Sequence, residues 1–214
     1  MKIGIIGAGF VGRTIAKRAV AKGHEVMLSN SRGPQSLFSL PIMLGCSVGT
    51  AEEAARFGDL VIVAVPMTAI DQLPVAALEG KLVIDANNYY HERDGRISAL
   101  DENRTTTSEM LAAALGHRRV VKAFNAIPMT ELETDGRPDG GAERRALPLA
   151  GDAPDDKARV AALYNDFGFT PVDAGALAEG WRFERDRPAY CKRMDAATLK
   201  RVLSETRREG GIAP

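Results

Sequence analysis

The strongest chemical signal is the N-terminal stretch GIIGAGFVG, in which Gly7, Gly9 and Gly12 have the spacing G-x-G-x-x-G. An apolar run precedes it and a helical pattern follows it, which is the context that a dinucleotide-binding turn requires. Gly7 would permit the tight turn, Gly9 would let backbone amides approach a diphosphate, and Gly12 would allow close helix–strand packing. The diphosphate would then meet free N–H groups at the positive end of the helix dipole. The alternative is a glycine-rich turn of an unrelated α/β protein.

The second signal is the segment Asn30-Ser31-Arg32, which follows the next apolar run. An NAD-binding protein carries an acidic residue about 20 residues after the glycines, for the ribose 2'-hydroxyl. Here that acid is missing, and the fixed donors of Arg32 suit a phosphate. The segment therefore predicts NADP(H) rather than NAD(H). Alternatively, Asn30 or Ser31 caps a helix through Ser36–Leu44, with Arg32 solvated.

Three further apolar runs end in residues that could contact the same ligand. Val65, Pro66 and Met67 end the first, Asn87 follows the second and Asn125 the third. The carboxyl ends of parallel strands meet at one crevice, where a dinucleotide lies. The two amides could bond the nicotinamide carboxamide, a ribose or a second substrate, although asparagine after a strand is also a common turn former.

The elements that must position these residues follow an alternating strand and helix rhythm, which is typical of a parallel sheet. Apolar, β-branched runs predict strands at Lys2–Gly7, Glu25–Ser29, Leu60–Val65, Leu82–Asp85 and Val120–Phe124. Amphipathic patterns predict helices at Val11–Lys22, Ala51–Phe57 and Ser108–Leu115. The fold class we expect is α/β, with a Rossmann-type doubly wound parallel sheet and a small C-terminal α/β appendage.

The appendage is predicted from a strand in RRALPLAGD, a helix at Asp155–Asp166 ended by Gly168, and a strand in FTPVDAG. We expect an NADP-binding domain over residues 1–143 and a smaller substrate or dimerisation region over 144–214. The turn-forming residues Glu133–Gly141 predict a mobile loop between them. The tail is predicted to form helices at Leu177–Arg187 and Ala196–Arg208, with Pro188 as a break.

Composition favours a small discrete ligand. Lysine plus arginine equals aspartate plus glutamate at 28 each, which gives no indication of a nucleic acid or membrane partner. Cys46 and Cys191 lack metal-ligand spacing and are expected to be free thiols, which together with the missing leader segment favours the cytoplasm. No cluster with metal-ligand spacing is present in the sequence, so we expect no metal.

The chain resembles the NADPH-dependent reductases of the deazaflavin coenzyme F420. The resemblance covers nearly the whole length and is carried by GIIGAGFVG, SNSRGPQSL, VIVAVP, KLVIDANNYY and VVKAFNAIP, and by GDAPDDKARVAALYNDFGFTPVDAGALAEGWRFE, residues 151–184. The combination of KAFN with the last segment is the most specific part. One departure is Asn88, where many relatives have a proline.

This resemblance implies that NADPH lies across the carboxyl edge of the sheet and that the second substrate stacks on its nicotinamide ring beside the smaller region. It also implies a homodimer. Residues expected to bind the cofactor, from the motifs and the resemblance together, are Gly7, Ala8, Gly9, Phe10, Val11, Gly12, Asn30, Ser31, Arg32, Val65, Pro66, Met67, Asn87 and Asn125.

The expected function is hydride transfer between NADP(H) and F420 or a flavin-like acceptor. Such a reaction needs two rings held face to face and no protein nucleophile, so no catalytic residue is assigned. One alternative is a reductase of another carbonyl or imine substrate, but little chain remains after Arg144 for the helical second domain of those enzymes. Another is a non-catalytic NADPH-binding sensor.

Overall fold

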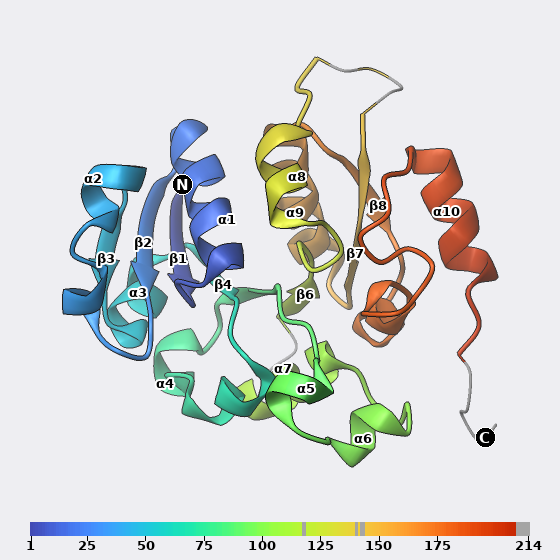
Figure 1. Cartoon of the computed structure of the whole chain (residues 1–214), viewed down its shortest axis with the longest axis horizontal. Coiled ribbons are helices and arrows are strands. Elements are labelled where there is room, and N and C mark those ends of the chain that lie inside the picture. The colour runs from blue at the N-terminus through green and yellow to red at the C-terminus, as the bar shows by residue number, and fades with distance from the viewer. Residues whose placement is uncertain (117–118, 140, 142–143, 209–214) are drawn as a thin grey trace.

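The protein is described here by a computed structural model, which covers residues 1–116, 119–139, 141 and 144–208. Over these residues the chain forms one eight-stranded sheet with the order β3-β2-β1-β4-β5-β6-β7-β8 (Figure 1). The strands are β1 Lys2–Ile6, β2 Glu25–Ser29, β3 Ser47–Gly49, β4 Leu60–Val63, β5 Leu82–Asp85, β6 Val120–Lys122, β7 Ala146–Gly151 and β8 Thr170–Asp173.

The first six strands are all parallel, and their order is that of a doubly wound nucleotide-binding sheet. The predicted fold class is therefore confirmed. Every predicted strand of this half exists, but three of them end one or two residues before the predicted ends at Gly7, Val65 and Phe124. The third strand was not predicted, because three residues are too few to show an alternating pattern.

Helices cover both faces of the sheet. On one face α1 (Phe10–Ala21), α8 (Met129–Thr134) and α9 (Pro154–Asp166) pack on a core that includes Ile5 and Phe124. On the other face α3 (Ala51–Phe57), η2 (Met67–Gln72), α4 (Val75–Leu78) and α7 (Thr107–Leu115) pack on a second core. The other helices among the described residues include η1 Pro34–Leu37, α2 Leu40–Leu44, α5 His91–Asp94, α6 Ser98–Asp101, η4 Leu177–Phe183 and α10 Ala196–Glu205.

The C-terminal region has the expected strand–helix–strand order and extends the same sheet. β7 pairs antiparallel with β6, and β8 pairs parallel with β7 across the α9 connection. Gly168 has a φ of +87° and ends α9, as predicted. The domain boundary near residue 144 stays a prediction. Of the loop predicted at Glu133–Gly141, Glu133 and Thr134 belong to α8 instead, and Gly140 lies outside the described residues.

Three predicted helices differ in the structure, and the one expected at Ala196–Arg208 ends at Glu205. The helix expected at Ser36–Leu44 is divided into η1 and α2, because Pro41 has no N–H to continue a helix from the preceding turn. The helix expected at Leu177–Arg187 is a 3-10 helix that ends at Phe183. Within the described ranges, no helix is long and apolar enough to cross a membrane.

Candidate functional site

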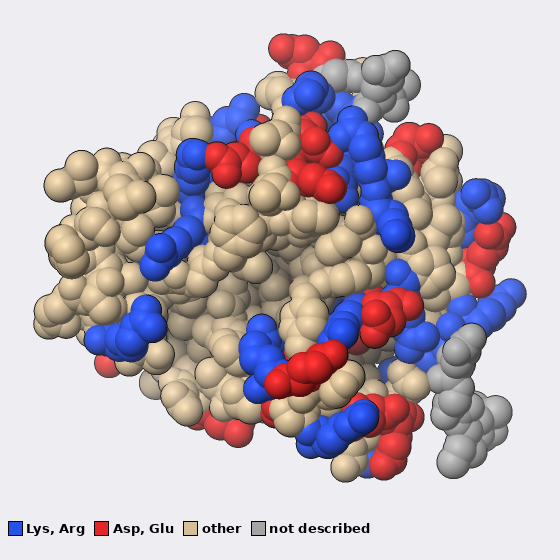
Figure 2. Space-filling model, in the orientation of Figure 1, with Lys and Arg blue, Asp and Glu red and all other residues tan. Residues whose placement is uncertain are grey.

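A cavity of about 560 Å³ opens at the carboxyl edge of β1, β2 and β4. In the orientation of Figure 2 the middle of the molecule is hollowed, and lysine and arginine side chains lie around the hollow. The cavity is lined by Ile6, Gly7, Ala8, Gly9, Asn30, Ser31, Arg32, Gly33, Thr50, Ala51, Ala64, Val65, Pro66, Ala69, Gln72 and Leu73. Eight predicted site residues are in this lining: Gly7, Ala8, Gly9, Asn30, Ser31, Arg32, Val65 and Pro66.

The three glycines of the turn differ in what surrounds them. Gly7 has a φ of +118°, and a Cβ there would overlap the carbonyl of Ala64. A Cβ on Gly12 would overlap the carbonyl of Gly7, so its absence lets α1 approach β1. A Cβ on Gly9 would meet nothing within 4 Å, so it would project into open space beside the cavity. A helix start with open space beside it is a place where a diphosphate can approach backbone N–H groups.

The start of α1 leaves its backbone donors available. Gly9 is the N-cap residue, and no side chain caps this helix. Phe10 points outward with 64% of its surface exposed, whereas Val11 packs on the core and Gly12 is buried. Arg13, which was not predicted, donates from Nε to the Ala8 carbonyl at 2.7 Å and so fixes the turn.

The segment Asn30-Ser31-Arg32, which is predicted to favour NADP(H), forms a turn that is held by hydrogen bonds of the Asn30 side chain. Its Oδ1 accepts from the N–H of Arg32 at 3.1 Å, and its Nδ2 donates to Ser36 Oγ at 2.8 Å. Neither η1 nor α2 has a side-chain N-cap hydrogen bond, so the helix-cap alternative is wrong. Ser31 and Arg32 are exposed, and among the described residues that line the cavity none is acidic and Arg32 is the only charged side chain.

Sequence patterns missed the far wall of the cavity, which Thr50, Ala51, Ala69, Gln72 and Leu73 form. Thr50 begins α3 with a capping box, in which its hydroxyl accepts from the N–H of Glu53 and the Glu53 carboxylate accepts from the N–H of Thr50. The Thr-x-x-Glu spacing was a sequence signal for this helix start. The side chain of Met67, predicted as a site residue, is buried in the core instead of lining the cavity.

The two predicted asparagines lie at the ends of the adjacent strands β5 and β6, beyond the cavity lining. Asn87 Oδ1 accepts from the N–H of Val65 at 2.8 Å, which fixes the orientation of the amide and leaves Nδ2 buried without a partner. Asn125 Nδ2 donates to the Phe183 carbonyl at 3.0 Å, which leaves Oδ1 buried without a partner. A buried polar atom without a hydrogen bond costs about 1–3 kcal/mol. Each of these two atoms is therefore a candidate for a contact with a ligand.

Asn88 supports Asn125. Its Nδ2 donates to the Asn125 carbonyl at 3.1 Å, and its Oδ1 accepts from Asn125 Nδ2 at 3.3 Å. A proline at position 88 would have no amide side chain to make this pair of contacts. The sequence marked Asn88 only as a departure from relatives. Its contacts with Asn125 link the segment after β5 to the segment after β6.

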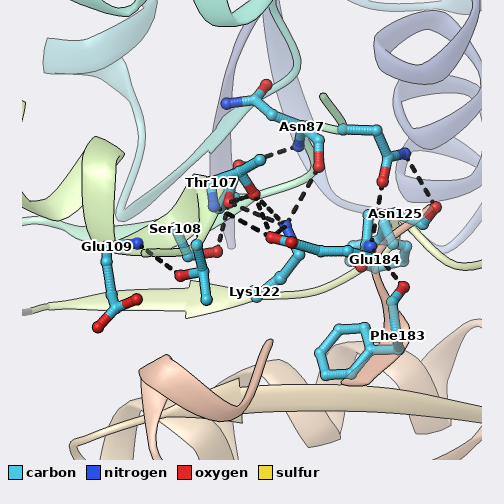
Figure 3. Close-up of polar contacts among 12 residues, drawn as sticks. Asn87, Thr107, Ser108, Glu109, Lys122, Asn125, Phe183 and Glu184 are labelled. Atoms are coloured by element: carbon cyan, nitrogen blue, oxygen red, sulfur yellow. Dashed lines mark hydrogen bonds and ion pairs between the residues drawn. The ribbon is translucent and has the colours of Figure 1, made fainter. Parts of the chain in front are cut away.

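A cluster of buried polar side chains lies under these asparagines (Figure 3). Lys122 Nζ lies within hydrogen-bond distance of Thr107 Oγ1 at 2.6 Å, the Asn87 carbonyl at 3.2 Å and Asp85 Oδ2 at 3.3 Å. Sequence reasoning missed this cluster, although a lysine within the apolar run VVKAF was its signal. Among the described residues, no group of three or more His, Cys, Asp or Glu could hold a metal ion.

The C-terminal region is tied to the segment after β5 by Tyr90 and Glu92. The hydroxyls of Tyr90 and Tyr190 lie 2.5 Å apart, and burial together with Tyr90 raises the pKa of the Tyr190 phenol. Both oxygens of Glu92 accept from Arg185, at 2.6 and 2.9 Å. These hydrogen bonds lower the pKa of Glu92 from 4.5 to about 2.

We expect the Glu92–Arg185 contact to stabilise the protein above the unfolded pKa and to be lost as the pH falls toward the folded value. NMR titration of the Glu92 carboxyl should give a midpoint near 2, and Arg185→Ala should return it toward 4.5. A midpoint near 4.5 in the unaltered protein would contradict this assignment.

Comparison with known proteins relates this geometry to a family. Residues 2–89, which span the glycine turn, Arg32, Val65 and Asn87, match the model of the family described as NADP oxidoreductase coenzyme F420-dependent. The chain is 32% identical over 185 residues to the metalloreductase STEAP3 of Rattus norvegicus, which is 86% of this chain and 36% of that protein. The chain thus spans about a third of the length of this curated relative.

Two solved structures are similar over most of both chains. The hypothetical protein SMa0349 of Sinorhizobium meliloti is 33% identical, with a TM-score of 0.77 and coverage of 91% of this chain and 95% of that one. A candidate F420-dependent NADP reductase of Arthrobacter sp. FB24 is 23% identical, with a TM-score of 0.69 and coverage of 82% and 85%. The second likeness shows the fold alone, and the first extends over nearly the whole chain. Together with the family match over the glycine turn, these similarities show that the chain belongs to the NADP oxidoreductase family described as coenzyme F420-dependent.

Proposed function

We propose that the protein is an NADPH-dependent oxidoreductase that transfers a hydride between NADP(H) and a deazaflavin or flavin-like acceptor. The observation that carries the proposal is the cavity at the glycine turn, which has Arg32 as the only charged side chain in its described lining. A carboxylate there would repel the 2'-phosphate of NADP, whereas a guanidinium attracts it. The family membership supports the same cofactor.

The lining of the cavity fits the adenosine and diphosphate end of NADP(H). Backbone amides at the start of α1 would bind the diphosphate beside Gly9, and Arg32 with Ser31 would bind the 2'-phosphate. Beyond the cavity lining, the buried Asn87 Nδ2 and Asn125 Oδ1 would offer a donor and an acceptor to the nicotinamide end. A primary carboxamide such as that of nicotinamide carries the complementary acceptor and donor.

When bound, NADPH supplies the hydride. The chain itself would contribute orientation, because Asn87 and Asn125 follow the paired strands β5 and β6 and each amide is held by a hydrogen bond to backbone. Fixing both rings in a reactive arrangement is how a protein accelerates such a transfer without a nucleophile. We propose that the acceptor ring enters beside the C-terminal region, where Tyr90 and Tyr190 meet.

Turnover tests the acceptor. The purified protein is mixed with NADPH and, in separate reactions, with F420, FMN, FAD or a ferric chelate, and the loss of the nicotinamide absorbance is followed. Consumption with F420 or a flavin supports the proposal. Ferric chelate is included because one relative is a metalloreductase by name. NADPH binding without consumption in any reaction would favour the non-catalytic sensor.

We further propose that the protein acts as a cytoplasmic homodimer on a small molecule, with residues 144–214 as its substrate or dimerisation region. Sedimentation of the purified chain measures the association state. A monomer at micromolar concentration would contradict the dimer.

A further inference from the structure

Lys122 is a fully buried cation that hydride transfer does not itself use. Its side chain has 0% exposure, as does that of Asp85, whose Oδ2 lies 3.3 Å from Nζ. Glu184 Oε1 lies 3.5 Å from the same nitrogen, and Thr107 Oγ1 lies at 2.6 Å. A buried ion pair is weak evidence for stability, because desolvation of two charges offsets their attraction. Its contacts therefore need another explanation.

The ion pair holds both backbone polar groups of Asn87. Asp85 Oδ1 accepts from the Asn87 N–H at 2.9 Å, and Lys122 Nζ donates to the Asn87 carbonyl at 3.2 Å. The Asn87 Oδ1 atom accepts from Val65, which lines the cavity. In Figure 3 the amide of Asn87 points away from the Lys122 ammonium. Every polar group of Asn87 is therefore held in place except Nδ2.

The C-terminal region completes this arrangement from the other side. Glu184 accepts from the N–H of Thr107 at 3.0 Å and from its Oγ1 at 2.8 Å. The neighbouring Phe183 carbonyl accepts from Asn125 (Figure 3). Gly180 leaves room for the lysine, because a Cβ there would lie 2.8 Å from Lys122 Cδ.

We propose that Lys122 is a positioning residue for the nicotinamide end of the site. It acts through Asn87: its ammonium fixes the end of β5, so that the unpartnered Asn87 Nδ2 meets the carboxamide oxygen. The inference rests on the proposed NADP(H) function. It predicts that Lys122 affects the affinity for whole NADPH and leaves the adenosine end, about Arg32 and Gly9, unaffected.

The test compares two probes. NADPH carries the nicotinamide, whereas adenosine 2',5'-bisphosphate carries only the adenosine end with its 2'-phosphate. In Lys122→Met, calorimetry should show about tenfold weaker NADPH binding, the size expected for one displaced hydrogen-bond contact, and unchanged bisphosphate binding. Lys157→Met is the matched control. It removes a lysine that is not part of this cluster and whose Nζ lies 2.7 Å from Asp173 Oδ2. That control should bind both probes as the unaltered protein does.

Because Lys122→Met leaves the Asp85 charge buried, it can fail to fold, and Gly180→Ala then decides the question. This variant keeps every charge and displaces Lys122 Cδ, so it should also weaken NADPH binding selectively. Equal losses for the two probes, or no loss for either, would overturn the positioning role. If the unaltered protein binds neither probe, the proposed function itself is wrong, which separates the two failures.

Discussion

Arg32→Glu should weaken NADPH binding by about 100-fold, the equivalent of about 2.7 kcal/mol. Arg32 is exposed, and no other described residue that lines the cavity is charged. A hydrogen bond to a charged group contributes about 1.5–3 kcal/mol, and the introduced carboxylate adds repulsion of the 2'-phosphate. NADH has a hydroxyl at that position, so its affinity should change by less than about threefold and selectivity should invert or disappear.

Fluorescence titration of the bound nicotinamide with NADPH and NADH measures the two dissociation constants. Arg201→Glu is the matched control, because Arg201 on α10 is an exposed arginine that pairs only locally with Glu205, at 3.0 Å. It makes the same change of charge outside the cavity and should leave both constants as they are. Equal weakening of NADPH and NADH by Arg32→Glu would show that Arg32 does not contact the 2'-phosphate.

Gly12→Ala should lower the stability of the protein, whereas Gly9→Ala should weaken NADPH binding without lowering stability. The Cβ of an alanine at position 12 would overlap the Gly7 carbonyl, and backbone cannot rotate away as a side chain can. Overpacking of a core costs about 1–3 kcal/mol of stability. We expect Gly12→Ala to cost about 3 kcal/mol or more, because α1 must move away from β1. At position 9 a Cβ meets nothing within 4 Å, so folding should be unaffected, within about 0.5 kcal/mol.

The two variants should also differ in why they bind NADPH more weakly. Gly9→Ala should fold as the unaltered protein does and yet bind NADPH about tenfold more weakly or worse, because the methyl group occupies the diphosphate cradle. Gly12→Ala should lose binding only together with stability. Urea denaturation measures the free energy of unfolding, and calorimetry measures the affinity. A Gly9→Ala protein with full affinity would place the diphosphate elsewhere.

Much of the fold could be predicted from the sequence. The apolar runs placed the ends of β1, β2, β4, β5 and β6 to within a few residues, because a strand covered on both faces is apolar throughout. The Gly7-x-Gly9-x-x-Gly12 spacing and the missing acid before Arg32 are local features, and the structure brings them together at one cavity. β3 was missed because its three residues carry too short a pattern.

The orientation of the asparagine amides could not be predicted. Asn87 and Asn125 each follow a strand, which the sequence showed, but which amide atom stays unpartnered depends on Val65, Asn88 and the Phe183 carbonyl. These partners are 22 to 58 residues away from the asparagine that they contact. A turn-forming asparagine and a ligand-binding one have the same local sequence, so only the tertiary contacts distinguish them.

The sequence by itself determined the sheet, the turn that would bind a diphosphate and the arginine that favours NADP(H), because each depends on periodicity, on a φ or on residue type within a short window. The tertiary structure alone decided that the buried Asp85, Thr107 and Lys122 form one cluster with the partly exposed Glu184. Those side chains come from β5, α7, β6 and the segment after η4, and charges from separate elements pair only once the sheet order has brought them together.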